Sequence, residues 1–131
     1  MHDQICQNIF QRACKILGLQ NFSLQTIGQA ASLQKSKNRY ILGSTKLKQK
    51  LVRVKIYTPK TGKQKKYSSI LSVIAHELAH HQKPPYRQFF QGRWINRIHY
   101  PEFYNQVKKN IFIFKSDPIL SKLYKNGKFI Y

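Results

Sequence analysis

Hydrophobic side chains recur along this chain with two different periods, which together predict helices and strands in one α+β fold. Helical periodicity of three to four residues marks three segments, residues 3–18, 67–82 and 101–112. Alternation of apolar and polar side chains predicts three strands, at residues 22–27, 40–46 and 51–57. Two segments follow neither period, a polar loop at 29–38 and a basic, aromatic stretch at 86–98. At 131 residues the chain is long enough for a single domain, residues 1–131.

The segment at 67–82 has one apolar arc and one polar arc. On a helical wheel the apolar side chains gather on one side, namely Ile70, Leu71, Ile74, Ala75 and Leu78. The opposite arc holds Val73, His76 and His80, with Glu77 at its edge. We therefore expect this helix to bury one face in the core and to form the floor of a cleft with the other.

The polar arc carries a motif with specific metal chemistry, His76-Glu77-Leu78-Ala79-His80. Histidines at positions i and i+4 of a helix lie on one face about 6 Å apart, so both imidazoles can reach one Zn²⁺. Glu77 projects about 100° around the axis, where its carboxylate can act as general base. The alternative is a helix with two exposed histidines and a chance glutamate, but random placement would give only about 0.003 such patterns in this composition.

A catalytic zinc site needs a third protein ligand and leaves its fourth position open. His99 follows His80 after 18 intervening residues and directly precedes the last predicted helix, so we favour it. Glu102 is the competitor, although a carboxylate in the first turn of a helix is stabilised there in any case. His2 is expected to be a mobile terminal residue and His81 a polar residue at a helix end.

A family resemblance follows from these residues. The helical segment HELAHH, followed by His99-Tyr100-Pro101-Glu102-Phe103-Tyr104, resembles the SprT-like zinc metallopeptidases and their WLM and YgjP-type relatives over residues 40–109. The resemblance implies a zincin-like fold, in which a small, mostly antiparallel sheet packs on the motif helix between flanking helices. It also implies zinc held by His76, His80 and His99, with Glu77 as the catalytic residue of peptide-bond hydrolysis. Tyr100 or Tyr104 is a candidate donor to the developing oxyanion.

The charge of the chain indicates a polyanionic partner. Lys and Arg number 24 against 4 Asp and Glu, for a formal net charge of +20, and this density of like charge opposes compaction unless a polyanion neutralises it. Nucleic acid is the favoured partner, through candidate contacts at Lys63, Lys65, Lys66, Arg87, Arg93 and Arg97. The three arginines alternate with aromatic residues that could stack on bases, although Phe89, Phe90 and Trp94 are more often core residues. The resemblance implies protein substrates bound or crosslinked to DNA.

The sequence also predicts the cellular compartment and the state of the two cysteines. The first residues lack the pattern of a signal peptide and no apolar run is long enough to span a membrane, so we expect a cytoplasmic protein. Cys6 and Cys14 lie about 12 Å apart on one predicted helix, too far for a disulfide, and are expected to be reduced core thiols. Two alternative functions remain, a metal-dependent nuclease or other hydrolase on the same site, and a non-catalytic nucleic-acid-binding protein with structural zinc.

Overall fold

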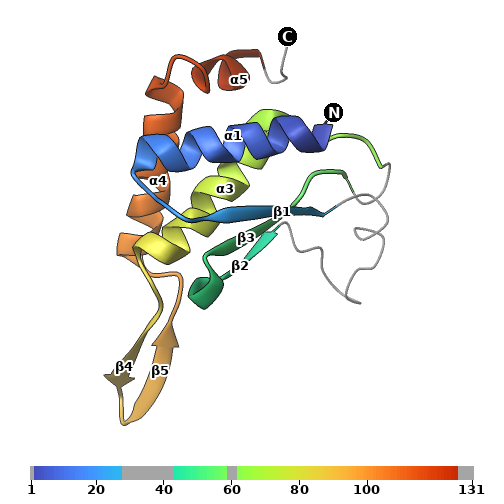
Figure 1. The fold of residues 1–131 in the computed structure, drawn as a ribbon. Helices are drawn as coiled ribbons and strands as arrows, with labels where there is room; N and C mark the ends of the chain where they lie inside the picture. Colours follow the sequence, from blue (N-terminus) through green and yellow to red (C-terminus); the bar gives the residue numbers. More distant parts are fainter. Residues whose placement is uncertain (1, 28–42, 59–61, 127–131) are drawn as a thin grey trace.

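The computed structural model describes residues 2–27, 43–58 and 62–126, and these form the expected α+β arrangement of helices around a small sheet (Figure 1). In chain order the elements are α1 (His2–Leu17), β1 (Ser23–Ile27), β2 (Gly43–Lys46), the 3-10 turn η1 (Leu47–Gln49), β3 (Leu51–Lys55), α3 (Tyr67–Gln82), β4 (Tyr86–Phe90), β5 (Arg93–Arg97), α4 (Pro101–Ser116) and α5 (Ser121–Asn126). The loop predicted at 29–38 and the start of the strand predicted at 40–46 lie outside the described residues.

The sheet is mixed rather than mostly antiparallel. Its strand order is β1-β3-β2, with β3 parallel to β1 and antiparallel to β2, so that Val52 faces Leu24 on one side and Thr45 on the other. The chain reverses between β2 and β3 through η1 and Lys50, whose φ of 50° is left-handed. The prediction of a mostly antiparallel sheet was therefore wrong for one of its two pairings. β3 lies parallel to β1, and β2 comes between these two strands in the sequence. A separate antiparallel hairpin is formed by β4 and β5.

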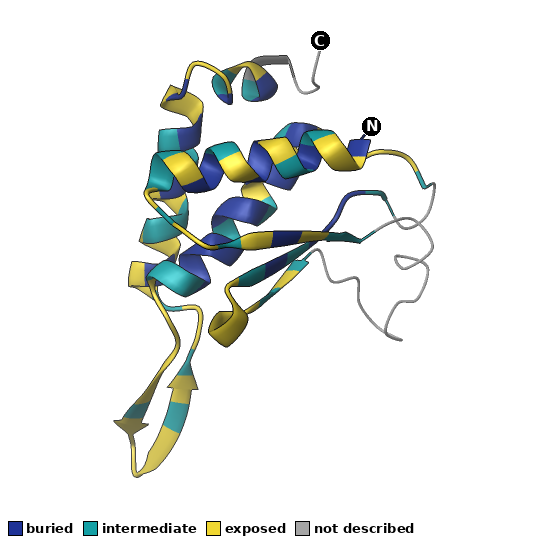
Figure 2. Cartoon of the chain, viewed as in Figure 1, coloured by how far each residue is buried: buried dark blue, intermediate teal, exposed yellow. Residues whose placement is uncertain are grey.

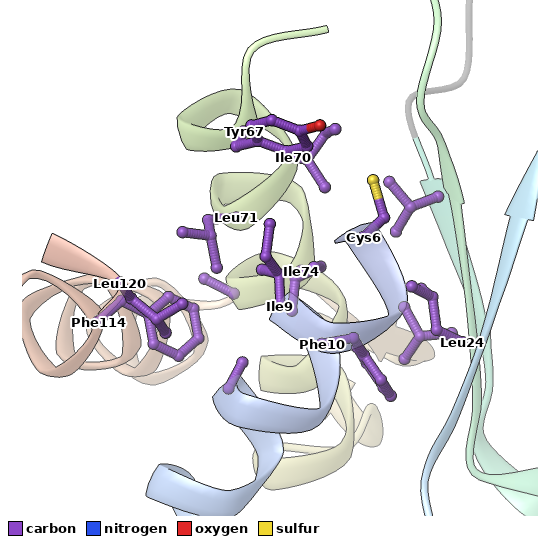
Figure 3. Packing of buried hydrophobic residues seen from close by; sticks show 14 of the residues in the cluster. Cys6, Ile9, Phe10, Leu24, Tyr67, Ile70, Leu71, Ile74, Phe114 and Leu120 are labelled. Atoms are coloured by element: carbon purple, nitrogen blue, oxygen red, sulfur yellow. The ribbon is translucent and has the colours of Figure 1, made fainter. Parts of the chain in front are cut away.

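Helices α1 and α3 pack against the sheet and enclose the core (Figure 3). All five apolar side chains of the predicted arc on α3 are fully buried: Ile70, Leu71, Ile74, Ala75 and Leu78. They meet Phe10 of α1 and Val52 and Val54 of β3, and each large side chain removed from water contributes about 1.5–3 kcal/mol. Cys6 and Cys14 are free, buried thiols as expected, and burial raises the pKa of each to about 12.

One histidine prediction was wrong: His2 is buried at the start of α1 rather than mobile. Only 4% of it is exposed, its Nδ1 lies 3.0 Å from the hydroxyl of Tyr67, and its Nε2 lies 3.0 Å from the carbonyl oxygen of Ile56. These partners follow far along the chain, so the position of His2 in the sequence gave no indication of them. His81 lies on the flank of α3, where it contacts the ring of Phe22 and the hydroxyl of Thr45.

The stretch at 86–98 that follows neither period is the β4–β5 hairpin, which projects away from the helices and the sheet (Figure 1). Its two-residue turn is Gln91-Gly92, and positive φ values of 50° and 82° fit the type I′ geometry of tight hairpins. Phe89, Phe90 and Trp94 are 59%, 46% and 59% exposed. The expectation that these rings belong to the core was therefore wrong, because within the described residues no other element covers the hairpin.

Candidate metal and catalytic site

Three histidines from two parts of the chain meet at the C-terminal half of α3. His76 and His80 lie on α3, and His99 lies just before α4. Each offers one ring nitrogen, and the three nitrogens lie within 4.8 Å of one another, close enough to hold one metal ion. Glu102, the competing third ligand, lies elsewhere, in a pocket with Lys83 and other residues of α4. Within the described residues His99 is thus the third member of the cluster.

The packing of α4 on α3 brings His99 to the other two rings. Phe103, fully buried in the first turn of α4, stacks on His80 with ring centroids 4.4 Å apart and meets His76 edge-on at 5.0 Å. Two turns further along, Asn110 is also fully buried, and its amide donates to the main-chain oxygen of Ala75 and to Oε1 of Gln82. The role of Asn110 was missed from sequence, although a polar residue on the apolar stripe of α4 was a signal that could have indicated it.

Two of the three histidine rings, His76 and His80, are favoured in the neutral form that binds metal. Burial lowers the pKa of His80 to about 4, and the charges of His76 and His99 act in the same direction. Burial also lowers the pKa of His76. Only the neutral imidazole has a lone pair free for a cation, so protons compete weakly with metal at these two rings at neutral pH. Nitrogens bound to a tetrahedral zinc lie about 3.4 Å apart, and the three ring nitrogens here lie within 4.8 Å of one another.

Glu77 shares a cleft with the three histidines. The cleft has a volume of about 390 Å³ and is lined by Gly43, Ser44, Thr45, Leu47, His76, Glu77, His80, Pro85, Ile98 and His99. Glu77 is only 6% exposed, and burial raises the pKa of its carboxyl group to about 7. The lining includes the edge strand β2 and the two residues that flank the β4–β5 hairpin, Pro85 and Ile98. The prediction of a cleft above the polar arc of α3 is confirmed.

Gly43 allows β2 to approach α3 closely beside Glu77. A Cβ atom at Gly43 would lie 2.8 Å from Cγ1 of Val73, 2.9 Å from the carbonyl oxygen of Arg53 and 3.5 Å from Cγ of Glu77. The first two distances are shorter than van der Waals contact permits, so only glycine fits without a shift of the strand. The position of the cleft wall therefore depends on this residue.

The two tyrosines that were candidates for oxyanion stabilisation have different surroundings. The hydroxyl of Tyr100 donates to the main-chain oxygen of Pro84 at 2.9 Å, and its ring meets that of Tyr86 edge-on. Tyr100 thereby contacts the first residue of the hairpin and the segment that precedes it. Tyr104 is 48% exposed and stacks on His99 with centroids 6.1 Å apart, so it is the tyrosine beside the cluster.

The six basic residues proposed for nucleic-acid contact fall into two groups at opposite ends of α3. Lys63, Lys65 and Lys66 line a pocket of about 710 Å³ before its first turn, where burial and the charge of Lys55 lower the pKa of Lys65 to about 8. The other group, Arg87, Arg93 and Arg97, lies on the hairpin after its last turn. A 16-residue helix is about 24 Å long, so the two groups form separate surfaces.

Comparison of the chain with protein-family models, with curated proteins and with solved structures finds no match. The resemblance to SprT-like metallopeptidases therefore remains a prediction from the residues of the motif. Among residues 2–27, 43–58 and 62–126, no helix combines the length and the apolar character that crossing a membrane requires.

Proposed function

We propose that the protein is a zinc-dependent metalloendopeptidase of the SprT-like type. The observation that carries the proposal is the convergence of three imidazole nitrogens beside the buried carboxylate of Glu77 in one open cleft. Three histidines are a donor set that suits zinc, and three protein ligands leave one coordination position for the reaction. A closed structural site would need a fourth ligand, and no fourth candidate joins the cluster among the described residues.

In the proposed hydrolysis, Glu77 and Tyr104 have different roles. When bound, zinc would supply the Lewis acidity that polarises a scissile carbonyl and lowers the pKa of water. Glu77 accepts the proton of the attacking water and passes it to the leaving amine. Tyr104 is the better placed donor to the developing oxyanion, because the hydroxyl of Tyr100 already serves Pro84.

The peptide substrate is proposed to bind along β2. Among the described strands, β2 pairs only with β3, and its other edge is the one along which we propose that an extended peptide pairs. Gly43, Ser44 and Thr45 of this strand line the cleft that also contains Glu77. A peptide added there would cross the cleft beside the general base.

The substrates are proposed to be proteins bound or crosslinked to nucleic acid, with DNA favoured by the family resemblance. The formal charge of +20 and the two basic surfaces at the ends of α3 support a polyanion close to the cleft. The same charge makes a metal-dependent nuclease the second candidate. Separate incubation with casein and with RNA or DNA distinguishes the two, according to which polymer is shortened.

The test of the peptidase proposal is the variant Glu77→Gln. It should keep zinc and the circular dichroism spectrum of the wild type while casein cleavage falls by about 10²–10⁴-fold, the usual contribution of a general base. Glu102→Gln is the matched control, because Glu102 is the only other glutamate and lies outside the cleft. Casein cleavage at the wild-type rate by Glu77→Gln would reject the mechanism.

A further inference from the structure

The β4–β5 hairpin exposes large aromatic side chains on both of its faces. The register pairs Phe89 with Trp94 and Phe90 with Arg93, so Phe89 and Trp94 share one face while Phe90 lies on the other. Figure 2 shows the hairpin as mostly exposed along its length. A two-stranded hairpin alone in water is only marginally stable, and exposed clusters of large apolar rings mark interaction sites. The hairpin therefore has the properties of a binding element.

Each aromatic face also carries a guanidinium group. On the first face Arg87 lies 5.3 Å from the ring centroid of Trp94, and the rings of Phe89 and Trp94 meet edge-on at 5.3 Å. On the second face Arg97 lies 5.6 Å from the centroid of Phe90. These cation–π contacts hold positive charges directly beside rings whose remaining surface is open.

The charge of the segment selects the class of partner. Residues 83–100 include Lys83, Arg87, Arg93 and Arg97 but no acidic residue, because the acids of the chain are Asp3, Glu77, Glu102 and Asp117. A basic ribbon with open aromatic rings complements a chain of phosphates whose bases are free to stack. Bases in a duplex are already stacked on one another, so rings exposed to this extent favour a single strand.

We propose that the β4–β5 hairpin is a binding element for single-stranded nucleic acid, with bases stacked on Trp94 and Phe89 and phosphates bound by Arg87 on the same face. Arg93 and Arg97 lie on the opposite face, where they would meet a strand that wraps around the ribbon. The inference rests on the proposed function only in that it locates the nucleic-acid partner of that function. The base of the hairpin is part of the catalytic cleft, since Pro85 and Ile98 line it. A protein attached to the bound strand is thereby held next to Glu77.

Trp94 is the only tryptophan of the chain, so tryptophan fluorescence, excited selectively over the tyrosines, reports directly on the hairpin. Titration of the full chain with a 20-nucleotide oligothymidylate should quench this fluorescence. In anisotropy measurements with the labelled oligonucleotide, Trp94→Leu should weaken binding about 5- to 150-fold, the range expected for loss of one stacked base. Trp94→Tyr, which keeps an aromatic ring, should retain most of the affinity, and Arg87→Gln should reduce the slope of log affinity against log salt by about 0.7.

Phe112→Leu is the matched control, because Phe112 is 71% exposed but lies on α4. Equal oligonucleotide affinity of Trp94→Leu and Phe112→Leu would overturn the inference. So would equal or tighter binding of a duplex of the same length, or binding to phosphatidylserine vesicles without any response to the oligonucleotide. Oligonucleotide binding needs no catalysis and is measured equally well in Glu77→Gln. Absence of binding would therefore reject the role of the hairpin without deciding whether the protein is a peptidase.

Discussion

Asn110 of α4 donates a hydrogen bond of 3.1 Å to the main-chain oxygen of Ala75, the residue directly before His76. The same amide donates to Oε1 of Gln82 at 2.7 Å, so one buried side chain joins α4 to two turns of α3. The start of α4 is connected to His99, and its register along α3 sets the distance between His99 and the two histidines of the motif. The geometry of the cluster thus depends on a residue that would not itself touch a metal.

Substitution of Asn110 should therefore affect both stability and metal binding. Asn110→Ala leaves Oε1 of Gln82 without this donor and opens a gap between the helices, which should lower the free energy of unfolding by about 1–3 kcal/mol. Zinc affinity should fall as well, because α4 no longer fixes His99. Urea denaturation and zinc titration measure the two effects. Asn105→Ala, at an exposed position of the same helix, should change neither, and wild-type stability and zinc affinity in Asn110→Ala would contradict this role.

Gly43→Ala tests the wall of the cleft. The added Cβ would clash with the carbonyl oxygen of Arg53 and with Val73, so β2 must move away from α3 beside Glu77. Zinc content should remain that of the wild type, whereas casein cleavage should fall, by up to about 10²-fold if the peptide shifts by 1 Å. Ser116→Ala, at an exposed position of α4 outside the cleft, serves as control. If Gly43→Ala cleaves casein as fast as the control, β2 does not position the substrate.

The ion pair between Arg12 and Asp117 predicts a specific loss of stability in acid. Arg12 of α1 contacts Asp117 at 2.6 Å, and Asp117 also accepts from the main-chain nitrogens of Ile119 and Leu120 between α4 and α5. The hydrogen bond from Arg12 holds the pKa of Asp117 below its ordinary value. Because the folded pKa is depressed, the stabilisation is complete above the unfolded pKa of about 3.9 and is lost as the pH falls through the lower folded value.

Asp117→Asn should accordingly lower the free energy of unfolding at pH 7 by about 1–3 kcal/mol and flatten its decline below pH 4. Urea denaturation at a series of pH values measures both effects. Glu102→Gln removes an exposed acid and is the control. An acid dependence of Asp117→Asn that is as steep as that of the wild type would show that other carboxyl groups dominate.

Burial explains which elements could be predicted from the sequence. The helix at 67–82 was predicted with its observed bounds, and the helix at 3–18 was shifted by one residue, because each buries one continuous face. The β4–β5 hairpin produced no recognisable period, since aromatic residues occupy both of its exposed faces. The parallel pairing of β1 with β3 depends on contacts between distant segments, and the alternation within a strand carries no information about its neighbours.

Part of the candidate site follows from local sequence, and the rest depends on contacts between distant segments. The spacing of His76 and His80 places both on one face of any helix, so this half of the cluster follows from local geometry. His99 joins them only because Phe103 and Asn110 pack α4 against α3, and no local pattern reports that contact. Gly43 was not singled out either, because the reason for a glycine there is the approach of Val73, 30 residues later.

The most direct test of the account is the amount of zinc bound per chain after equilibrium dialysis, compared between the wild type, His99→Ala and Glu102→Ala. The wild type and Glu102→Ala should each bind about one zinc ion, because three imidazoles form the site and Glu102 lies outside it. His99→Ala should lose most of the metal at the same free zinc concentration. Equal zinc content in His99→Ala and the wild type, or none in the wild type, would contradict the three-histidine site on which the proposed activity depends.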